Sequence, residues 1–214
     1  SINYRLINGM KDRDLVPSIS YKDQTRDIVK AIKWLHNNVE KYQGNANKLV
    51  LVGLSSGAYE TALISTDESY LKEEGLSFDI LAATVSLDVH MYDIPLAIKL
   101  MAGSSLEQQI PFYKYVFGET EESQRQASPV TFVDNPNIKP FLLISAGLKR
   151  NTHQNVSNEV SEALKKALLK AKHKAWHHHY AKRHHASLTK RFLHPKNQVK
   201  VAFQTFFDQI GLNH

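Results

Sequence analysis

The sequence predicts an α/β protein with a mostly parallel sheet that is flanked by helices. Two observations carry this prediction. Short apolar runs of strand length alternate with longer segments in which apolar residues return every three or four positions. The 214 residues contain no internal repeat and no low-complexity linker, so residues 1–214 are expected to form one domain. Strands that alternate with helices in this way pair in parallel and place the helices on the sheet faces.

The first half of the chain is predicted to contain three strands and three helices. Residues 1–6 read as the end of a short strand, and a polar loop follows to about Ser20. Apolar residues at helical spacing predict a helix over 23–42. The unbroken apolar run at 48–54 is typical of a strand covered on both faces. Behind it we expect a helix at 56–65, a strand at 79–87 and a helix at 94–101.

The second half continues the alternation. A helix-and-loop stretch follows to about Asn137, and its part from about 95 to 126 is expected to form a small cap. After it we expect strands at 140–145 and 174–180 and helices at 155–171 and 197–210. The apolar residues of the first of these helices form the single stripe that packing on a sheet requires, at Val156, Val160, Leu164 and Leu168.

Charge is unevenly distributed along the chain. The net charge is +6, yet residues 161–200 alone hold eleven Lys or Arg and a single acid, Glu162. These charges stand between apolar positions at regular spacing, so we interpret them as a solvated face. Binding to nucleic acid is the alternative, but the segment lacks the interleaved aromatic residues on which bases stack. We therefore expect no nucleic-acid partner.

Cysteine and long apolar runs are both absent from the sequence. Without cysteine the chain has no disulfide framework and no thiolate chemistry, although this leaves its compartment open. No apolar run approaches the roughly 20 residues of a membrane helix, so no membrane span is expected.

The motif with the clearest chemical meaning is Gly53-Leu54-Ser55-Ser56-Gly57, which joins the predicted strand at 48–54 to the helix behind it. A serine in so tight a turn sits where neighbouring side chains would clash, and glycine at both flanks removes the clash. The turn lifts the Ser55 hydroxyl out of the sheet and aims the Ser56 backbone N–H at a developing oxyanion. We predict a nucleophile elbow; a glycine-rich turn without chemistry is the alternative.

A nucleophilic serine needs a base, and the histidines near the last predicted strand are the candidates. His177, His178 and His179 lie on that strand, where alternating side chains pack or face solvent. His184 and His185 follow it, in a loop that can reach back over the sheet edge. We predict His185 as the base, with His184 as the alternative. Adjacent histidines on a strand point apart and no His-Glu-x-x-His motif is present, so we expect no zinc site and no cofactor.

Several further motifs resemble those of one enzyme family. They are Asn3-Tyr4-Arg5-Leu6, Asp27 to Trp34, the elbow with Ala58, Tyr92-Asp93-Ile94, Ala127-Ser128-Pro129-Val130, Phe141 to Gly147 and His185-Ala186-Ser187-Leu188. On these residues the chain resembles the esterase/lipase branch of the α/β-hydrolases, which includes kynurenine-formamidase-like and hormone-sensitive-lipase-like enzymes. The resemblance implies hydrolysis of a small-molecule carboxylic ester, with Ser55 as nucleophile and His185 as base. An N-formyl amide substrate would need the same chemistry and stays open.

The family's catalytic acid is the main departure from that pattern. It lies a few residues past the strand that ends at Gly147, where this chain has no carboxylate until Glu159. Asn151 could orient a histidine but would not stabilise its charged form. Asp88 or Asp93, near the end of the preceding strand, could substitute for the acid in space. A hydrolase-like domain that binds a ligand without turnover is therefore an alternative function.

The family's oxyanion loop and first strands would lie upstream of Tyr4, and the sequence begins at Ser1. We therefore expect this chain to be a fragment of a longer protein. One edge of its sheet would then be unpaired, and self-association through that edge is expected.

Overall fold

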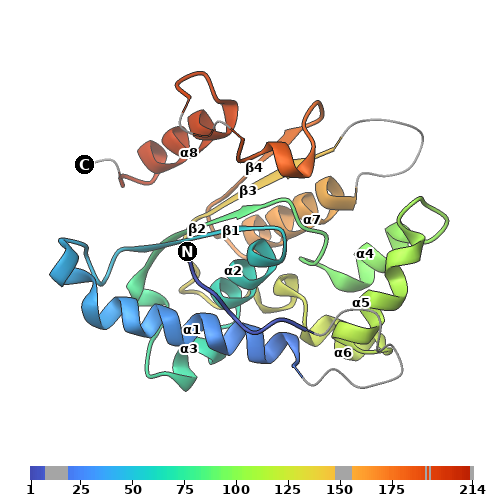
Figure 1. The fold of residues 1–214 in the computed structure, drawn as a ribbon, viewed down its shortest axis with the longest axis horizontal. Helices are drawn as coiled ribbons and strands as arrows, with labels where there is room; N and C mark the ends of the chain where they lie inside the picture. Colours follow the sequence, from blue (N-terminus) through green and yellow to red (C-terminus); the bar gives the residue numbers. More distant parts are fainter. Residues whose placement is uncertain (8–18, 148–155, 191, 193, 213–214) are drawn as a thin grey trace.

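A four-stranded parallel sheet forms the centre of the molecule (Figure 1). The computed structural model describes residues 1–7, 19–147, 156–190, 192 and 194–212. The strands lie in the order in which they occur in the chain: β1 (Leu49–Leu54), β2 (Leu81–Leu87), β3 (Phe141–Ala146) and β4 (Ala175–Tyr180). The predicted parallel sheet flanked by helices is confirmed, and strand β1 lies at one end of the strand order.

Helices occupy most of the segments between the strands. The α-helices are α1 (Tyr21–Asn38), α2 (Ser56–Thr66), α3 (Ser69–Glu73), α4 (Ile94–Met101), α5 (Ile110–Phe117), α6 (Glu121–Gln126), α7 (Val156–Lys170) and α8 (Gln198–Gln209). Short 3-10 turns are η2 (Val39–Tyr42), η3 (Phe78–Ile80), η4 (Glu107–Gln109), η5 (Pro129–Phe132) and η6 (His185–Ser187). No helix among the described residues is both long and apolar enough to cross a membrane.

The sheet separates two apolar cores. Helices α1, α2 and α7 cover one face and α8 covers the other (Figure 1). Side chains of a strand point alternately to the two faces, and β2 follows this rule. Its Val85 and Leu87 pack in the core on the α8 side, whereas Ser86 donates a hydrogen bond to the carbonyl of Ala58 on α2. The strand is thereby fixed between both helix layers, with its carboxyl end beside the start of α2.

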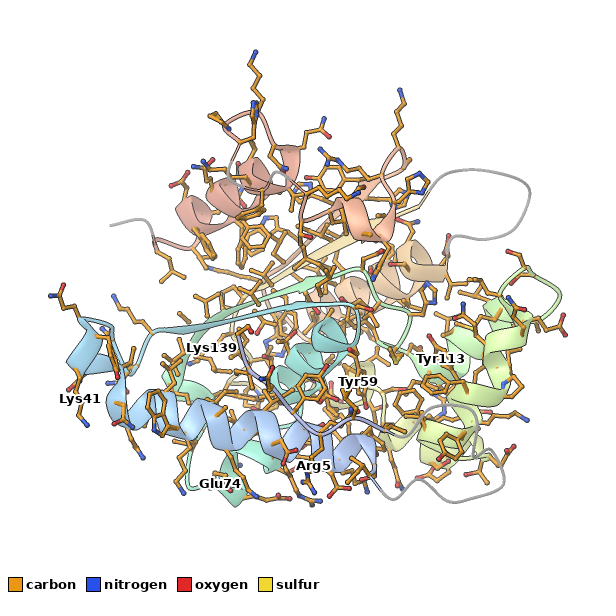
Figure 2. All side chains as sticks on the ribbon, viewed as in Figure 1. Arg5, Lys41, Tyr59, Glu74, Tyr113 and Lys139 are labelled. Carbon is orange, nitrogen blue, oxygen red and sulfur yellow. The ribbon has the colours of Figure 1, made fainter. Side chains whose placement is uncertain are left out.

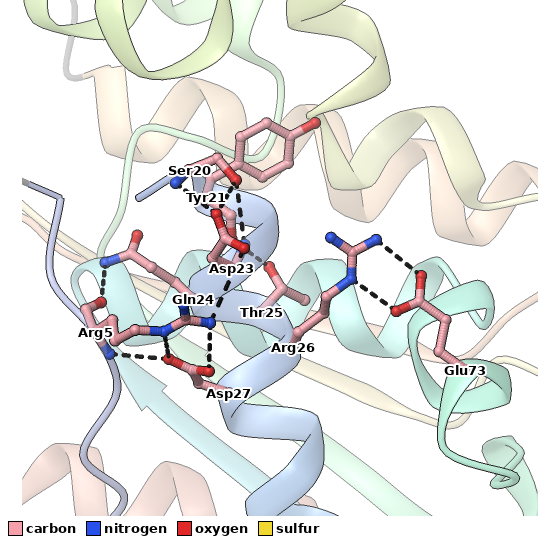
Figure 3. A network of polar contacts seen from close by, with 9 residues as sticks. All are labelled: Arg5, Ser20, Tyr21, Asp23, Gln24, Thr25, Arg26, Asp27 and Glu73. Atoms are coloured by element: carbon pink, nitrogen blue, oxygen red, sulfur yellow. Dashed lines mark hydrogen bonds and ion pairs between the residues drawn. The ribbon is translucent and has the colours of Figure 1, made fainter. Parts of the chain in front are cut away.

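The strand expected at residues 1–6 is wrong: residues 1–7 have no regular secondary structure. Helix α1 binds the backbone groups that a neighbouring strand would have paired (Figure 3). The Arg5 N–H donates to the Asp27 carboxylate, 3.1 Å away, and Gln24 donates to the Arg5 carbonyl at 2.9 Å. The Arg5 guanidinium also forms a two-pronged ion pair with Asp27. Side chains of α1 therefore hold this segment where a ladder was expected.

Helices α4, α5 and α6 gather at the carboxyl end of the strands (Figure 2), and aromatic rings join α5 to the body of the molecule. The ring of Phe117 on α5 lies 5.4 Å from the ring of Tyr59 on α2 and 5.6 Å from that of Tyr21 on α1. Tyr113 stacks edge-on against the same Phe117. Rings packed in this way stabilise a contact beyond the area they bury, so α5 is held firmly over the start of α2.

Candidate active site

Ser55 occupies a strained turn between β1 and α2. Its φ is +58° and its ψ is −127°, a conformation that non-glycine residues rarely adopt. Strain of this kind costs of order 1–3 kcal/mol and persists where the surrounding structure imposes it. Here the Ser55 N–H donates to the Leu87 carbonyl of β2 at 2.9 Å, while the Ser55 carbonyl accepts from Ala58 and Tyr59 of α2. Sheet and helix together therefore impose the turn.

The two glycines of the motif contribute unequally to this turn. A Cβ atom on Gly53 would collide with the Gly57 carbonyl and lie 2.7 Å from the Ala58 nitrogen, so only glycine fits there. A Cβ on Gly57 would meet nothing within 4 Å. The expectation that both glycines remove a clash is therefore wrong for Gly57.

Ser56 begins helix α2, where backbone N–H groups have no partner within the helix. Among the described residues, no acceptor takes the Ser56 N–H. The positive end of the helix dipole reinforces this donor. The Ser56 side chain has a different partner: its hydroxyl forms a hydrogen bond with the Tyr4 hydroxyl, 3.0 Å away.

His185 forms the central contact of the site with Asp88. Its Nδ1 donates to Asp88 Oδ2 across 2.7 Å, which leaves Nε2 to accept a proton. The Asp88 side chain is 6% exposed and the His185 side chain 49% exposed, so a buried carboxylate orients an accessible imidazole. His184 lies beside them in the same loop, but the hydrogen bond to Asp88 belongs to His185.

Asp88 is held by more than the histidine. Its other oxygen, Oδ1, accepts from the Ala146 N–H at 2.8 Å and from the Ser157 hydroxyl at 2.5 Å. Its backbone adopts a left-handed conformation, with φ +54°, directly after β2. Every carboxylate oxygen therefore has a donor, as a buried charge requires. Strain and burial at one residue are typical of a functional position.

The other acidic candidates have different surroundings. Asp93 caps helix α4 by accepting from the Leu96 N–H at 3.1 Å, which is a structural role. Glu159 is exposed on α7. Asn151 lies outside the described residues. Of the two carboxylates proposed to substitute for the family's acid, the structure brings Asp88 to His185.

Ser55, Asp88 and His185 line one cleft of about 500 Å³. Its volume falls within the range of about 300–1,000 Å³ typical of small-molecule sites. Helix α5 and the turn before it supply an apolar wall that includes Leu106 and Phe112. His90 also lines the cleft, and burial lowers its pKa, although Asp88 opposes that effect. The wall is therefore mainly uncharged on the side of His90 and α5.

The three histidines of β4 lie away from this cleft. His177 and His179 both contact the Ser145 hydroxyl, at 2.8 and 2.9 Å, and His177 also contacts Glu162 of α7. His178 is exposed. Within the part of the chain that the structure describes, no three His, Asp or Glu side chains gather closely enough to hold a metal ion.

Two relatives match parts of this sequence. A probable isoprenylcysteine alpha-carbonyl methylesterase of Arabidopsis thaliana is 27% identical over 143 residues, covering 59% of this chain and 28% of that protein. Phenmedipham hydrolase of Pseudarthrobacter oxydans is 36% identical over 70 residues, covering 30% of this chain and 13% of that one. The chain thus spans less than a third of the length of either relative.

The structural likeness extends over almost the whole chain. Esterase B of Lactobacillus rhamnosis matches with a TM-score of 0.70 at 16% identity, covering 98% of this chain and 65% of that one. An acetyl ester-xyloside bifunctional hydrolase of Caldicellulosiruptor lactoaceticus matches with a TM-score of 0.67 at 17% identity, covering 98% and 70%. The family model of BD-FAE matches residues 1–168. This chain therefore belongs to the BD-FAE family, an esterase family with the α/β-hydrolase fold.

Proposed function

We propose that the protein hydrolyses carboxylic esters through an acyl-enzyme on Ser55. The observation that carries this proposal is the hydrogen bond from His185 to the buried Asp88, at the edge of the cleft that Ser55 also lines. An oriented imidazole with a free Nε2 is what a serine needs as its base. The arrangement argues against a hydrolase-like domain that only binds, because a ligand-binding role alone would not require a buried carboxylate that orients an accessible imidazole.

Acylation uses four residues of the chain: Ser55, His185, Ser56 and Asp88. Ser55 Oγ attacks the ester carbonyl carbon, and its proton passes to His185 Nε2. Charge develops on the carbonyl oxygen, and the Ser56 N–H donates a hydrogen bond to it. The carbon–oxygen bond to the alcohol then breaks as His185 returns the proton to the leaving oxygen. Asp88 stays ionised throughout and stabilises the charged imidazole.

Deacylation repeats these steps with water. His185 takes a proton from the water, the resulting oxygen nucleophile attacks the acyl-Ser55 carbonyl, and Ser55 leaves with the proton from His185. The carboxylic acid is released and the starting state returns. An N-formyl amide would be cleaved by the same sequence, with an amine as the leaving group.

Small-acyl or aryl esters fit the cleft best. In our proposal residues 1–214 act as one domain, and the stretch at about 95–126 caps the cleft. Leu106 and Phe112 supply the apolar surface for such a substrate. The cap consists of short helices and is too small to cover a long lipid chain.

A fluorophosphonate probe and a p-nitrophenyl ester test this function. Wild type should be labelled and should release p-nitrophenol, whereas Ser55→Ala should lose both activities and His185→Ala should lose most of each. Circular dichroism of each variant checks that it still folds. Labelling or turnover that persists in Ser55→Ala would refute the assignment.

We also propose that two copies associate through β1. This strand ends the sheet, and its outer backbone edge pairs with no strand among the described residues; Val52 on it is an apolar side chain that is 53% exposed. Sedimentation velocity should show a dimer in wild type that Val52→Lys weakens. Val201→Lys, at a position of α8 that is 47% exposed, is the matched control. If Val52→Lys leaves the sedimentation coefficient unchanged, the edge is not an interface.

A further inference from the structure

A second cavity opens beside the cleft that contains Ser55. It has a volume of about 520 Å³ and is lined by Arg183, Ser187, Lys190, His194, Lys196 and Asn197. These residues lie between β4 and α8, on the loop that also carries His185. The proposed ester hydrolysis uses none of these six side chains.

The lining of this cavity is strongly cationic. It combines the side chains of Arg183, Lys190 and Lys196 with His194 and contains no carboxylate among the described residues. These three cations form no ion pair with any residue that the structure describes. Positive charges that converge on a concave surface concentrate anions there. Lys190, His194 and Lys196 are exposed and Arg183 is half-buried, so these groups are accessible to a ligand from solvent.

Arg183 connects the two cavities, because it lines both of them. Its Nη1 donates to the Ser187 carbonyl at 3.2 Å, which fixes the guanidinium to the turn η6. A guanidinium has five N–H donors, so four remain for a ligand once this bond is made. Arg183 is thus placed to contact a molecule that occupies both cavities.

The helix end at the cavity does not supply the anion site. Helix α8 starts here, but the Asn197 side chain already accepts from the Val199 and Lys200 N–H groups. The side chain of Asn197 also donates to the Lys190 carbonyl at 3.0 Å, which ties the two ends of the loop together. Recognition must therefore come from the cationic side chains, on a loop that is braced internally.

We propose that this cavity binds a carboxylate or phosphate carried by the alcohol portion of the ester substrate. The proposal rests on the ester hydrolysis proposed above. His185 returns its proton to the leaving alcohol, so the loop that carries His185 borders the leaving-group side of the cleft. Arg183 stands two residues before His185 on that loop. An anionic leaving group would reach past His185 to Arg183, Lys190 and Lys196.

A matched pair of acetate esters tests the proposal. 4-Acetoxyphenylacetate and 4-acetoxyphenylacetamide release similar phenols but differ in one negative charge. We expect Lys190→Gln and Lys196→Gln each to raise KM for the anionic ester about 5- to 10-fold, with kcat unchanged, since a charged hydrogen bond contributes on this scale. KM and kcat for ester hydrolysis of the neutral 4-acetoxyphenylacetamide should not change. Equal effects on both esters, or no effect on either, would overturn the proposal.

Lys182→Gln is the control for charge alone. Lys182 is exposed, lies next to Arg183 and lines neither cavity. It should leave both KM values at the wild-type level. Lys190→Arg should restore the KM of Lys190→Gln, which separates loss of charge from loss of folding.

Inorganic phosphate distinguishes a substrate site from an effector site. Phosphate should inhibit hydrolysis of the anionic ester competitively, and it should not affect hydrolysis of the neutral ester. If phosphate instead alters kcat for the neutral ester, the cavity binds a separate effector, and the proposal that it binds the substrate's leaving group is wrong.

Calorimetry with inorganic phosphate separates the proposed anion site from the proposed ester hydrolysis. If wild type hydrolyses neither ester, the proposed function fails, yet binding of phosphate to wild type and its loss in the Lys190→Gln/Lys196→Gln double variant would still support the anion site. If hydrolysis is normal and phosphate binds wild type and double variant alike, only the anion site fails.

Discussion

Two regions among the described residues each bring a serine, a histidine and an acidic residue together. On one side of the sheet the Ser145 hydroxyl contacts His177, and His177 contacts Glu162. At the carboxyl end of the strands, Ser55 shares a cleft with the His185–Asp88 pair. The same residue types therefore occur twice, with distances in the first region that would by themselves suggest a catalytic triad.

Accessibility separates the two regions. Ser145 is fully buried and His177 has a side chain that is 5% exposed, whereas Glu162 at the far end is 31% exposed and shared with Lys165. In the other region the order is reversed, because the acid is buried and the histidine is exposed. A substrate can reach His185 but not Ser145. A buried acid with an accessible histidine is therefore typical of a catalytic site, whereas a buried serine with an exposed acid is typical of a structural network.

Backbone geometry separates them as well. Ser55 and Asp88 both have a positive φ, and Ser56 offers an N–H without an acceptor among the described residues. Ser145 lies within a regular strand, where its N–H and carbonyl belong to the sheet. Strain and an available backbone N–H donor, rather than residue type, therefore distinguish our proposed active site from the Ser145 region.

The largest expected difference between the two regions is the effect of removing each serine. Ser55→Ala should reduce kcat by about a factor of 10⁶, the scale found when a catalytic serine is removed elsewhere. Ser145→Ala should keep fluorophosphonate labelling and kcat within a few-fold of wild type, at some cost in stability. Loss of labelling in a folded Ser145→Ala protein would place the nucleophile in the wrong region.

A smaller effect is expected at the support of Asp88. Ser157→Ala removes one donor from Asp88 Oδ1 and leaves the one from Ala146, so kcat should fall about tenfold with little change in KM. Ser157→Thr, which retains the hydroxyl, should recover most of the loss. Ser161→Ala on the same helix is the control, since its buried hydroxyl has no hydrogen-bond partner in the described structure. If kcat falls equally in Ser157→Ala and Ser161→Ala, the Ser157 hydroxyl contributes only to the stability of the fold and does not position Asp88.

The smallest effect concerns stability against pH. Burial lowers the pKa of His177 below its ordinary value, and this outweighs Glu162, which raises it. As pH falls below about 6.5, the unfolded chain gains a proton at this residue before the folded one does. The free energy of unfolding should therefore decrease on acidification from pH 7 to 5.5. Urea midpoints of wild type and His177→Gln should show a flatter dependence in the variant; parallel curves would contradict the effect.

The strands and helices were largely predictable because their apolar periodicity is a local property. The run at 48–54 and the stripe through Val160 and Leu164 gave correct elements, and the elbow followed from its flanking strand and helix. The strand predicted at residues 1–6 was wrong because a strand needs a neighbouring strand to pair with. Here the backbone groups of Arg5 bind the side chains of Gln24 and Asp27 on α1 instead. Sequence shows that a segment can be a strand, but not what lies beside it.

The acid of the site could only be narrowed to two candidates from the sequence. Asp88 and Asp93 both follow the strand at 79–87, and the only local difference is that Asp93 belongs to a Tyr92-Asp93 pair that is typical of a structural role. The difference arises from three distant groups, at Ala146, Ser157 and His185, that converge on Asp88 alone. The available signal was the lack of any carboxylate at 148–158, which left three alternatives: an acid from the preceding strand, a neutral acceptor at Asn151, or no catalytic acid at all.

The most direct test of this account is kcat/KM of Asp88→Asn, measured with a p-nitrophenyl ester. An asparagine keeps the size of the side chain but cannot stabilise a charged imidazole, so we expect a loss of about 10⁴-fold. Glu162→Gln, the matching change in the Ser145 region, should retain wild-type kcat/KM. If Asp88→Asn stays within tenfold of wild type, or if Glu162→Gln shows the larger loss, Asp88 is not the acid of this site.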